Sequence, residues 1–275
     1  MNLKRALPEL LLLLLLAGYT AFAAGPFVWT AVMSLRTTSE IMADPYALPA
    51  IVHWEKFPDA WVRSNYATYF KNSVWVSAVC VVFLSLVGAM AAHCLARYRF
   101  PGNRIVFFLV FSTIILPPQI TVIGLFQILA DYKLIDTHTG LILVYISMQL
   151  PLTIYILESF FARIPQELYD AARMDGYSDL EIFWRITLPI GMPAIATTAI
   201  LNIIYIWNEF LYAVVLLTSD AKRTLPLGIQ RFMGDQLEDI GMLATGLMIA
   251  VIPVIVVYVL FSEKMIQGMT AGAVK

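Results

Sequence analysis

Polar side chains that could bind or pass a solute lie within an otherwise apolar stretch of the chain, residues 190–217. Glu209 is the ionisable group of this stretch, and such a group usually faces the interior of a helix bundle or a water-filled path. Glu209 therefore either lines a transport path or joins a structural hydrogen-bond network between helices, and the sequence leaves both interpretations open. The polar side chains on neighbouring turns are Asn202, Tyr205, Asn208 and Tyr212.

Residue groupings that are typical of enzymes and metal sites are missing from the sequence. There is no G-x-x-x-x-G-K-[ST] loop, so the chain is not expected to hold nucleotide phosphates. No Ser/His/Asp or paired-carboxylate arrangement suggests catalysis. Cys80 and Cys94 would lie about 21 Å apart along one helix, too far for a disulfide. His93 is interpreted as a packed or interfacial side chain. We expect no catalytic residue, metal or cofactor on this chain.

The composition places the chain in a lipid bilayer. Of its 275 residues, 60% are hydrophobic and 13% are charged, whereas a soluble domain carries roughly 25% charged residues. The net charge of −1 offers no basic surface for nucleic acid. A membrane-spanning helix needs about 20 mainly apolar residues. The stretches that meet this length are residues 10–35, 73–96, 105–129, 140–161, 190–217 and 241–261. The sequence predicts an all-α polytopic membrane protein with six transmembrane helices.

The third apolar stretch contains a helix-breaking sequence, Leu116-Pro117-Pro118-Gln119. Backbone groups freed by proline at membrane depth must be satisfied by neighbouring protein or by water. Gln119 therefore either faces a cavity on a possible path or belongs to a kink that serves packing alone.

The orientation in the membrane is predicted from basic residues in one short loop. Arg97, Arg99 and Arg104 lie close together between the second and third stretches, and short cytoplasmic loops collect such residues. Both termini are then cytoplasmic. The outer segment 36–72 is rich in Trp, Tyr and Pro, which fits either an interfacial aromatic belt or a surface for an extracytoplasmic partner.

A polar segment between the fourth and fifth stretches carries the signals of a short helix. Pro165 suits a first turn, and Glu167 and Asp170 place negative charge near the positive helix end. Gly176 falls where a left-handed C-cap is expected. The residues that share one face at helical spacing are Leu168, Ala171 and Ala172.

A second short helix is predicted after this bend. Ser178 and Glu181 form an S-x-x-E capping box, and Pro189 is expected to end the helix before the next span. Two short helices, with a bend at Gly176 and an exposed face of small residues, suit docking into a groove on another protein.

This segment resembles the EAA coupling loop of bacterial ABC importer permeases. The matching residues, in order and spacing, are Asp170-Ala171-Ala172, Gly176 and Ile186-Thr187-Leu188-Pro189. Two positions depart from the family pattern: Asp170 replaces a glutamate, and Tyr177 replaces the usual alanine after Gly176.

The resemblance implies a type I ABC importer permease fold, in which loop 163–189 transmits ATP-driven motion to the membrane helices. ATP and Mg would then be bound by partner ATPase subunits and not by this chain. The residues that the resemblance places at the ATPase contact are Glu167, Asp170, Ala171, Ala172, Asp175, Gly176, Phe183 and Arg185.

Other segments resemble the carbohydrate branch of these permeases, and in particular the second membrane subunit of maltose-type sugar importers. They are Trp207-Asn208-Glu209-Phe210-Leu211, Thr224-Leu225-Pro226-Leu227-Gly228 and the tail Gly268-Met269-Thr270-Ala271-Gly272-Ala273-Val274-Lys275. The resemblance implies import of a sugar or related polyol through the bacterial inner membrane. It also implies tail contacts of Gly272 and Lys275 with an ATPase.

The implied partners are a second homologous permease, two cytoplasmic ABC ATPase subunits and an extracytoplasmic substrate-binding protein, within the lipid bilayer. We expect one transmembrane permease domain over residues 1–275, with the first helix and outer loop at 1–65 and the permease core at 66–275. Two alternatives stay open: a permease for a non-sugar solute such as a glycerol phosphate or glycoside, and a secondary transporter. A secondary transporter often shows inverted repeats and midplane ion-coupling groups, and the sequence shows neither.

Overall fold

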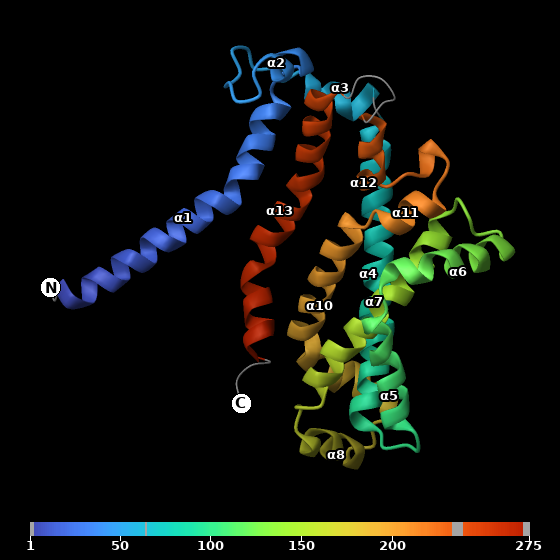
Figure 1. The fold of residues 1–275 in the computed structure, drawn as a ribbon. Coiled ribbons are helices and arrows are strands. Elements are labelled where there is room, and N and C mark those ends of the chain that lie inside the picture. The colour runs from blue at the N-terminus through green and yellow to red at the C-terminus, as the bar shows by residue number, and fades with distance from the viewer. Residues whose placement is uncertain (1–2, 64, 233–238, 272–275) are drawn as a thin grey trace. The chain divides into compact units, whose positions relative to one another are not determined.

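The computed structural model describes residues 3–63, 65–232 and 239–271, and every regular element within these ranges is helical (Figure 1). The predicted all-α class is confirmed. The long helices are α1 (Leu3–Ser34), α4 (Tyr66–Arg97), α7 (His138–Phe161), α10 (Leu188–Asn208) and α13 (Ile240–Ala271). The short helices are α2 (Thr38–Ala43), α3 (Lys56–Arg63), α5 (Asn103–Ser112), α6 (Pro118–Asp131), α8 (Gln166–Met174), α9 (Asp179–Ile182), α11 (Leu211–Leu216) and α12 (Leu225–Gly228).

The described helices supply the predicted membrane spans. Five are long and apolar enough to cross a bilayer: Glu9–Ser34, Tyr66–Arg97, His138–Phe161, Asp179–Asn208 and Ile240–Phe261. A sixth span arises if α5, the turn Thr113–Ile115 and α6 are counted together, although this pair is bent by 105°. The chain is thus a multi-pass membrane protein, with five or six candidate spans in the part that the structure describes.

The bend in the third span follows from its two prolines, as the sequence predicts. Leu116 leaves the helical region with ψ 123°, and Pro117 is extended with ψ 132°. A residue before proline is disfavoured in the helical conformation. Pro118 then opens α6 at a first-turn position, where the missing N–H removes no helical hydrogen bond.

The chain folds into two compact units. Unit 2 comprises Ala67–Gly228 and Pro253–Lys275, and its core consists of two buried clusters. The first cluster joins α4, α6, α7 and α11 through residues such as Leu84, Leu129, Tyr145 and Leu216. The second joins α4, α7 and α10 to the polar segment before α10, through residues such as Ala92, Phe161, Tyr169 and Ile195. The polar segment is therefore packed against these helices.

Unit 1 comprises Met1–Tyr66 and Ile229–Ile252, and polar contacts join its distant segments. The Ser34 carbonyl, at the end of α1, accepts from Lys56 Nζ and from Thr245 Oγ1 of α13, both at 3.1 Å. Thr38 Oγ1 donates to Asp239 Oδ1 at 2.6 Å. The division of the chain into units 1 and 2 does not test the predicted domain boundary at residue 65, and this boundary stays a prediction.

The burial of Lys56 predicts a pH dependence of stability for unit 1. Burial lowers the pKa of Lys56 to about 8 from its ordinary 10.5, although Asp239, Glu40 and Glu55 act to raise it. Between these pH values the unfolded chain binds more protons than the folded chain, so stability is expected to rise as the pH increases. Melting curves of detergent-solubilised wild type and Lys56→Met test this prediction. The variant should lack this part of the rise, and identical pH profiles would contradict the assignment.

Candidate functional site

The polar segment begins with α8, a helix of nine residues (Gln166–Met174). Pro165 occupies its N-cap and Glu167 its first turn, in agreement with the start signals in the sequence. A helix this short is marginal in water by itself. Its position therefore depends on the two side chains that it buries, Tyr169 and Ala172.

The left-handed cap predicted at Gly176 is confirmed, because its φ is +83°. The Tyr177 N–H donates to the Ala172 carbonyl, and the Gly176 N–H donates to the Arg173 carbonyl, both at 3.0 Å. This pair of bonds is a Schellman motif. A Cβ at Gly176 would meet no heavy atom within 4 Å. Glycine is therefore required here for its backbone conformation and not for space.

The second helix of the segment begins as predicted. Ser178 Oγ accepts from the Glu181 N–H at 3.4 Å, and the Glu181 carboxylate accepts from the Ser178 N–H at 3.0 Å. The capping box is therefore present.

The predicted end of this helix at Pro189 is wrong. α9 continues through a π-helical turn, Phe183–Thr187, directly into α10. The Leu188 N–H donates to the Phe183 carbonyl, five residues back. This wider turn relieves the clash that a proline ring makes with a regular helix. Asp179–Asn208 is consequently one continuous span.

The surface of the segment is only partly as predicted. Of the eight expected ATPase-contact residues, two are buried: Ala172 at 4% and Phe183 at 3% exposure. Ala172 follows Tyr169 by three positions and so lies on the inward face of α8. The expectation of an exposed small-residue face is therefore wrong for Ala172. The exposed members are Glu167, Asp170, Ala171, Asp175, Gly176 and Arg185.

Large apolar side chains lie exposed among these polar residues. They are Leu168, Met174, Leu180 and Trp184. Together with Glu167, Asp170, Ala171 and Asp175 they form what we call the loop surface. Apolar side chains gathered in a polar rim are typical of a protein contact site. Arg185 reaches back to its own segment, 3.6 Å from Glu181 and 5.1 Å from the Tyr177 ring.

A row of buried polar side chains joins this segment to two membrane helices. Tyr169 Oη lies 3.1 Å from Thr187 Oγ1, and Thr187 Oγ1 lies 3.0 Å from His93 Nδ1. The row therefore runs from α8 through the π-helical turn that leads into α10, and ends on α4. The sequence predicts a packed or interfacial position for His93 and no role for Tyr169. A buried tyrosine in a short amphipathic helix is the signal that could have identified the row.

Arg97 ties the last turn of α4 to the end of α7 and to the same tyrosine. Its guanidinium donates to the carbonyls of Phe161 and Ile164, the latter at 2.6 Å. Its Cζ lies 4.1 Å from the centroid of the Tyr169 ring, within cation–π range. A cation also suits the negative end of a helix.

Glu209 lies in a break of the fifth span that the sequence does not predict. α10 ends at Asn208, Glu209 is extended with ψ 130°, and α11 begins at Leu211. The carboxylate of Glu209 accepts from the Tyr212 N–H at 2.9 Å and from the Ala213 N–H at 3.3 Å. It also accepts from Tyr145 Oη at 2.6 Å. Glu209 thus satisfies the free N–H groups of α11 and joins them to α7, as a structural network requires.

Other predicted path residues connect this break to neighbouring helices. Tyr212 Oη bonds the Pro118 carbonyl at 3.1 Å and Thr121 Oγ1 at 2.7 Å, which links α11 to the break in the third span. Asn202 Nδ2 donates to Thr153 Oγ1 at 2.9 Å, and Tyr205 hydrogen-bonds Gln149. Asn208 donates to its own helix, at Ile204, and Gln119 is exposed. Tyr145, Gln149 and Thr153 of α7 complete the group, and sequence analysis does not identify them.

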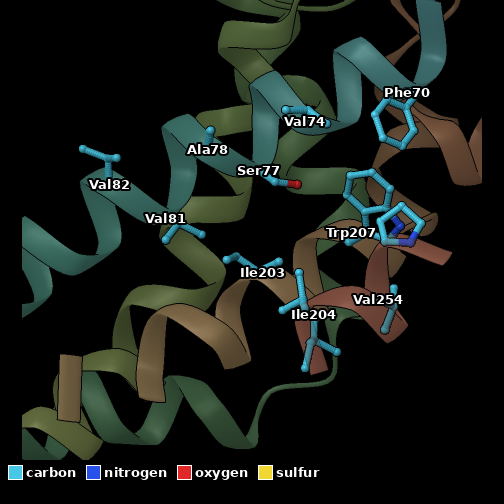
Figure 2. A pocket seen from close by; sticks show the side chains of 12 residues that line it. Phe70, Val74, Ser77, Ala78, Val81, Val82, Ile203, Ile204, Trp207 and Val254 are labelled. Carbon is cyan, nitrogen blue, oxygen red and sulfur yellow. The ribbon is translucent and has the colours of Figure 1, made fainter. Parts of the chain in front are cut away.

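A separate apolar groove runs between α4, α10 and α13 and has a volume of about 400 Å³. Figure 2 shows Phe70 and Val81 of α4, Ile203 and Trp207 of α10, and Val254 of α13 around it. The Ser77 hydroxyl and the Trp207 indole N–H are the polar groups among the lining side chains. A hydroxyl-rich solute needs many hydrogen-bonding partners, so this groove is unsuited to bind one.

The predicted tail contacts Gly272 and Lys275 lie outside the described residues. The residues before them, through Ala271, continue α13.

The sequence and fold both match known membrane transport proteins. Residues 84–266 match the family model described as binding-protein-dependent transport system inner membrane component. The diacetylchitobiose uptake system permease protein NgcG of Streptomyces coelicolor is 34% identical, covering 94% of this chain and 86% of that protein. The trehalose transport system permease protein SugB of Mycobacterium tuberculosis is 34% identical and covers 100% of both chains.

A solved structure shares the fold. A chain of a bacterial ABC transporter involved in the import of the acidic polysaccharide alginate superposes with a TM-score of 0.81. The match covers 96% of this chain and 98% of that chain, at 22% sequence identity.

Proposed function

The chain belongs to the family of binding-protein-dependent transport system inner membrane components, and from this premise we propose that it imports a di- or oligosaccharide as one membrane subunit of an ATP-driven transporter. The two relatives described above are named for diacetylchitobiose uptake and for trehalose transport. The observation that carries the proposal is the polar segment 163–189, which combines the family's coupling pattern with an exposed surface of apolar and acidic side chains.

The loop surface is proposed to bind a cytoplasmic ABC ATPase. Exposed Leu168, Met174, Leu180 and Trp184 supply apolar contact area, and Glu167, Asp170 and Asp175 supply charge for a basic rim. This pattern suits a short helix seated in a groove. ATP and Mg would be bound by two such ATPase subunits, and this chain supplies the surface that they move.

The remaining assembly follows the same proposal. A second homologous permease would complete the path, and an extracytoplasmic binding protein would deliver the solute. The short loop with Arg97, Arg99 and Arg104 supports a cytoplasmic location for itself, the loop surface and both termini, in the inner membrane of a bacterium. Gly272 and Lys275 stay predicted ATPase contacts.

The wall of the translocation path is proposed to include α6, α7, α10 and α11. Polar side chains in this wall can exchange hydrogen bonds with solute hydroxyls. The broken backbone at Pro117 and at Glu209 supports this choice, because irregular backbone at membrane depth occurs where it is covered by protein or lines a wet cavity. The proposed path residues are Gln119, Asn202, Tyr205, Asn208 and Tyr212, with Glu209 holding the break in place.

Transport would proceed by exchange between two global states. ATP closes the ATPase pair, the loop surface moves with it, and the spans change from inward-facing to outward-facing. Each ligand contributes only by binding one state more tightly than the other.

The sugar assignment is tested with the complete complex. The binding protein that co-purifies with the complex is titrated with trehalose, diacetylchitobiose, maltose and glycerol 3-phosphate, and ATP hydrolysis by the complex is followed in lipid vesicles. We expect one of the sugars to bind and to stimulate hydrolysis. Stimulation by glycerol 3-phosphate alone would reject the sugar. Uptake that needs an ion gradient but no ATP would reject the importer and leave a secondary transporter.

A further inference from the structure

We infer that the row Tyr169–Thr187–His93 is the linkage that makes α8 move together with α10 and α4 when the loop surface is displaced. This inference rests on the proposed function, because a partner ATPase supplies the displacement. Tyr169, Thr187 and His93 are positioning residues in this inference, since they act through the elements they join and touch no solute.

The anchoring of α8 depends on a small number of contacts. The helix has nine residues and buries the side chains of Tyr169 and Ala172. Ala172 supplies an apolar contact, which does not fix the orientation of the helix. Tyr169 reaches inward with a polar tip, so it is the buried side chain of α8 that can hold the helix at a fixed angle and depth.

A single hydroxyl at the middle of the row bonds both of its neighbours. Thr187 has one hydroxyl proton and lies between Tyr169 Oη and His93 Nδ1, and its exposure is 0%. It can donate to one neighbour while it accepts from the other. Tyr169 and His93 are also buried, so removal of the Thr187 hydroxyl leaves Tyr169 Oη and His93 Nδ1 without this partner.

The row meets α10 at the end of the π-helical turn, Phe183–Thr187. A π-turn inserts one residue into the helix and so rotates every side chain that follows relative to an unbroken α-helix. This insertion sets the direction of Thr187 toward His93. The π-helical turn therefore positions the row at the junction between the polar segment and the span.

Arg97 extends the same linkage to α7. Its bonds to the Phe161 and Ile164 carbonyls hold the end of α7, while its guanidinium covers the Tyr169 ring. The ends of α4 and of the π-helical turn thereby contact the Tyr169 side chain, and α7 is joined to it through Arg97. A force on α8 is then passed to three spans through these side-chain contacts, in addition to the backbone connections at Pro165 and Gly176.

The test separates the hydroxyl of Thr187 from its shape. Thr187→Val keeps the shape and removes the hydroxyl, whereas Thr187→Ser keeps the hydroxyl and removes the methyl group. Thr198→Val is the matched control, because Thr198 is equally buried on α10 but donates to Ile195 of its own helix at 3.0 Å. Each variant is purified as the full complex in lipid vesicles, with the co-purified binding protein and the sugars used above.

We expect Thr187→Val to retain its ATPase subunits and basal ATP hydrolysis. Its transport per ATP hydrolysed should fall about fivefold, since a net hydrogen bond of typical strength shifts an equilibrium by this factor. Thr187→Ser should restore the ratio, and Thr198→Val should leave it unchanged. Tyr169→Phe combined with Thr187→Val should be no worse than Thr187→Val alone, because both remove the same row.

Hydrogen exchange of the α8 amides gives a second readout that does not depend on the solute. Exchange over residues 166–174 should be faster in Thr187→Val than in Thr198→Val. Normal coupling or unchanged exchange in Thr187→Val overturns the linkage, and so does a Thr187→Ser variant that fails like Thr187→Val, because packing would then be the cause. If no ATPase co-purifies with the wild-type chain, the proposed function is rejected. The linkage, which rests on that function, is then rejected as well.

Discussion

Replacing Gly176 with valine is expected to detach or uncouple the ATPase subunits while the permease still inserts in the membrane. Gly176 has a φ of +83°, a conformation that costs a residue with a Cβ about 1–2 kcal/mol. A β-branched side chain loses further rotamer freedom. Strain of about 1–2 kcal/mol shifts an equilibrium by roughly 5- to 30-fold. The measurements are ATPase co-purification and binding-protein-stimulated ATP hydrolysis.

Two further variants isolate the bend as the cause. Gly102 has a φ of +90° and, like Gly176, no heavy atom within 4 Å of a built Cβ. Gly102→Val therefore introduces comparable strain in a loop outside the polar segment, and coupling should survive. Gly176→Asn should also preserve coupling, because asparagine tolerates the left-handed conformation. Normal ATPase recovery and hydrolysis in Gly176→Val would show that the bend is not part of the coupling element.

Replacing Glu209 is expected to lower thermal stability before it affects transport. The carboxylate accepts from Tyr145 Oη and from the N–H groups of Tyr212 and Ala213. Glu209→Ala leaves these three donors without their acceptor, a loss on the order of 3 kcal/mol. Glu209→Gln keeps one carbonyl oxygen for the N–H groups of α11 and should fall between alanine and wild type. Melting curves of the complex and vesicle uptake are measured in parallel.

The neighbouring Asn208→Ala serves as the control for the melting curves alone, because Asn208 is exposed and bonds its own helix at Ile204. A path role for the Glu209 charge has the opposite signature. Glu209→Gln would then melt like wild type and fail to transport, and the network interpretation would be wrong.

Local rules in the sequence predict the caps and the proline bend well. The left-handed Gly176, the Ser178–Glu181 box and the break at Pro117 each depend on residues within five positions of one another. Their conformations follow from backbone sterics and from nearby hydrogen bonds. These features need no knowledge of which helices pack together.

The features that the sequence does not predict depend on distant contacts. Thr187 meets His93 across 94 positions, and Glu209 meets Tyr145 across 64. No proline or glycine marks the break at Glu209 in the sequence. The Glu209 carboxylate itself stabilises the break by accepting hydrogen bonds from α11 and α7. The π-helical turn allows Pro189 to lie within a continuous helix, because it removes the steric clash by which proline normally ends a helix. Single-sequence patterns contain none of these pairings.

The dependence of α8 on Thr187 also has a consequence for biosynthesis. The ribosome makes the chain from its N-terminus, so α4 and α7 precede α8, while Thr187 follows Tyr169 by 18 positions. α8 is too short to be stable alone. Its outward surface is therefore formed only after the first turns of α10 have been made and packed. A nascent or truncated chain that stops before this point is therefore expected to present no ordered surface to the proposed ATPase partner.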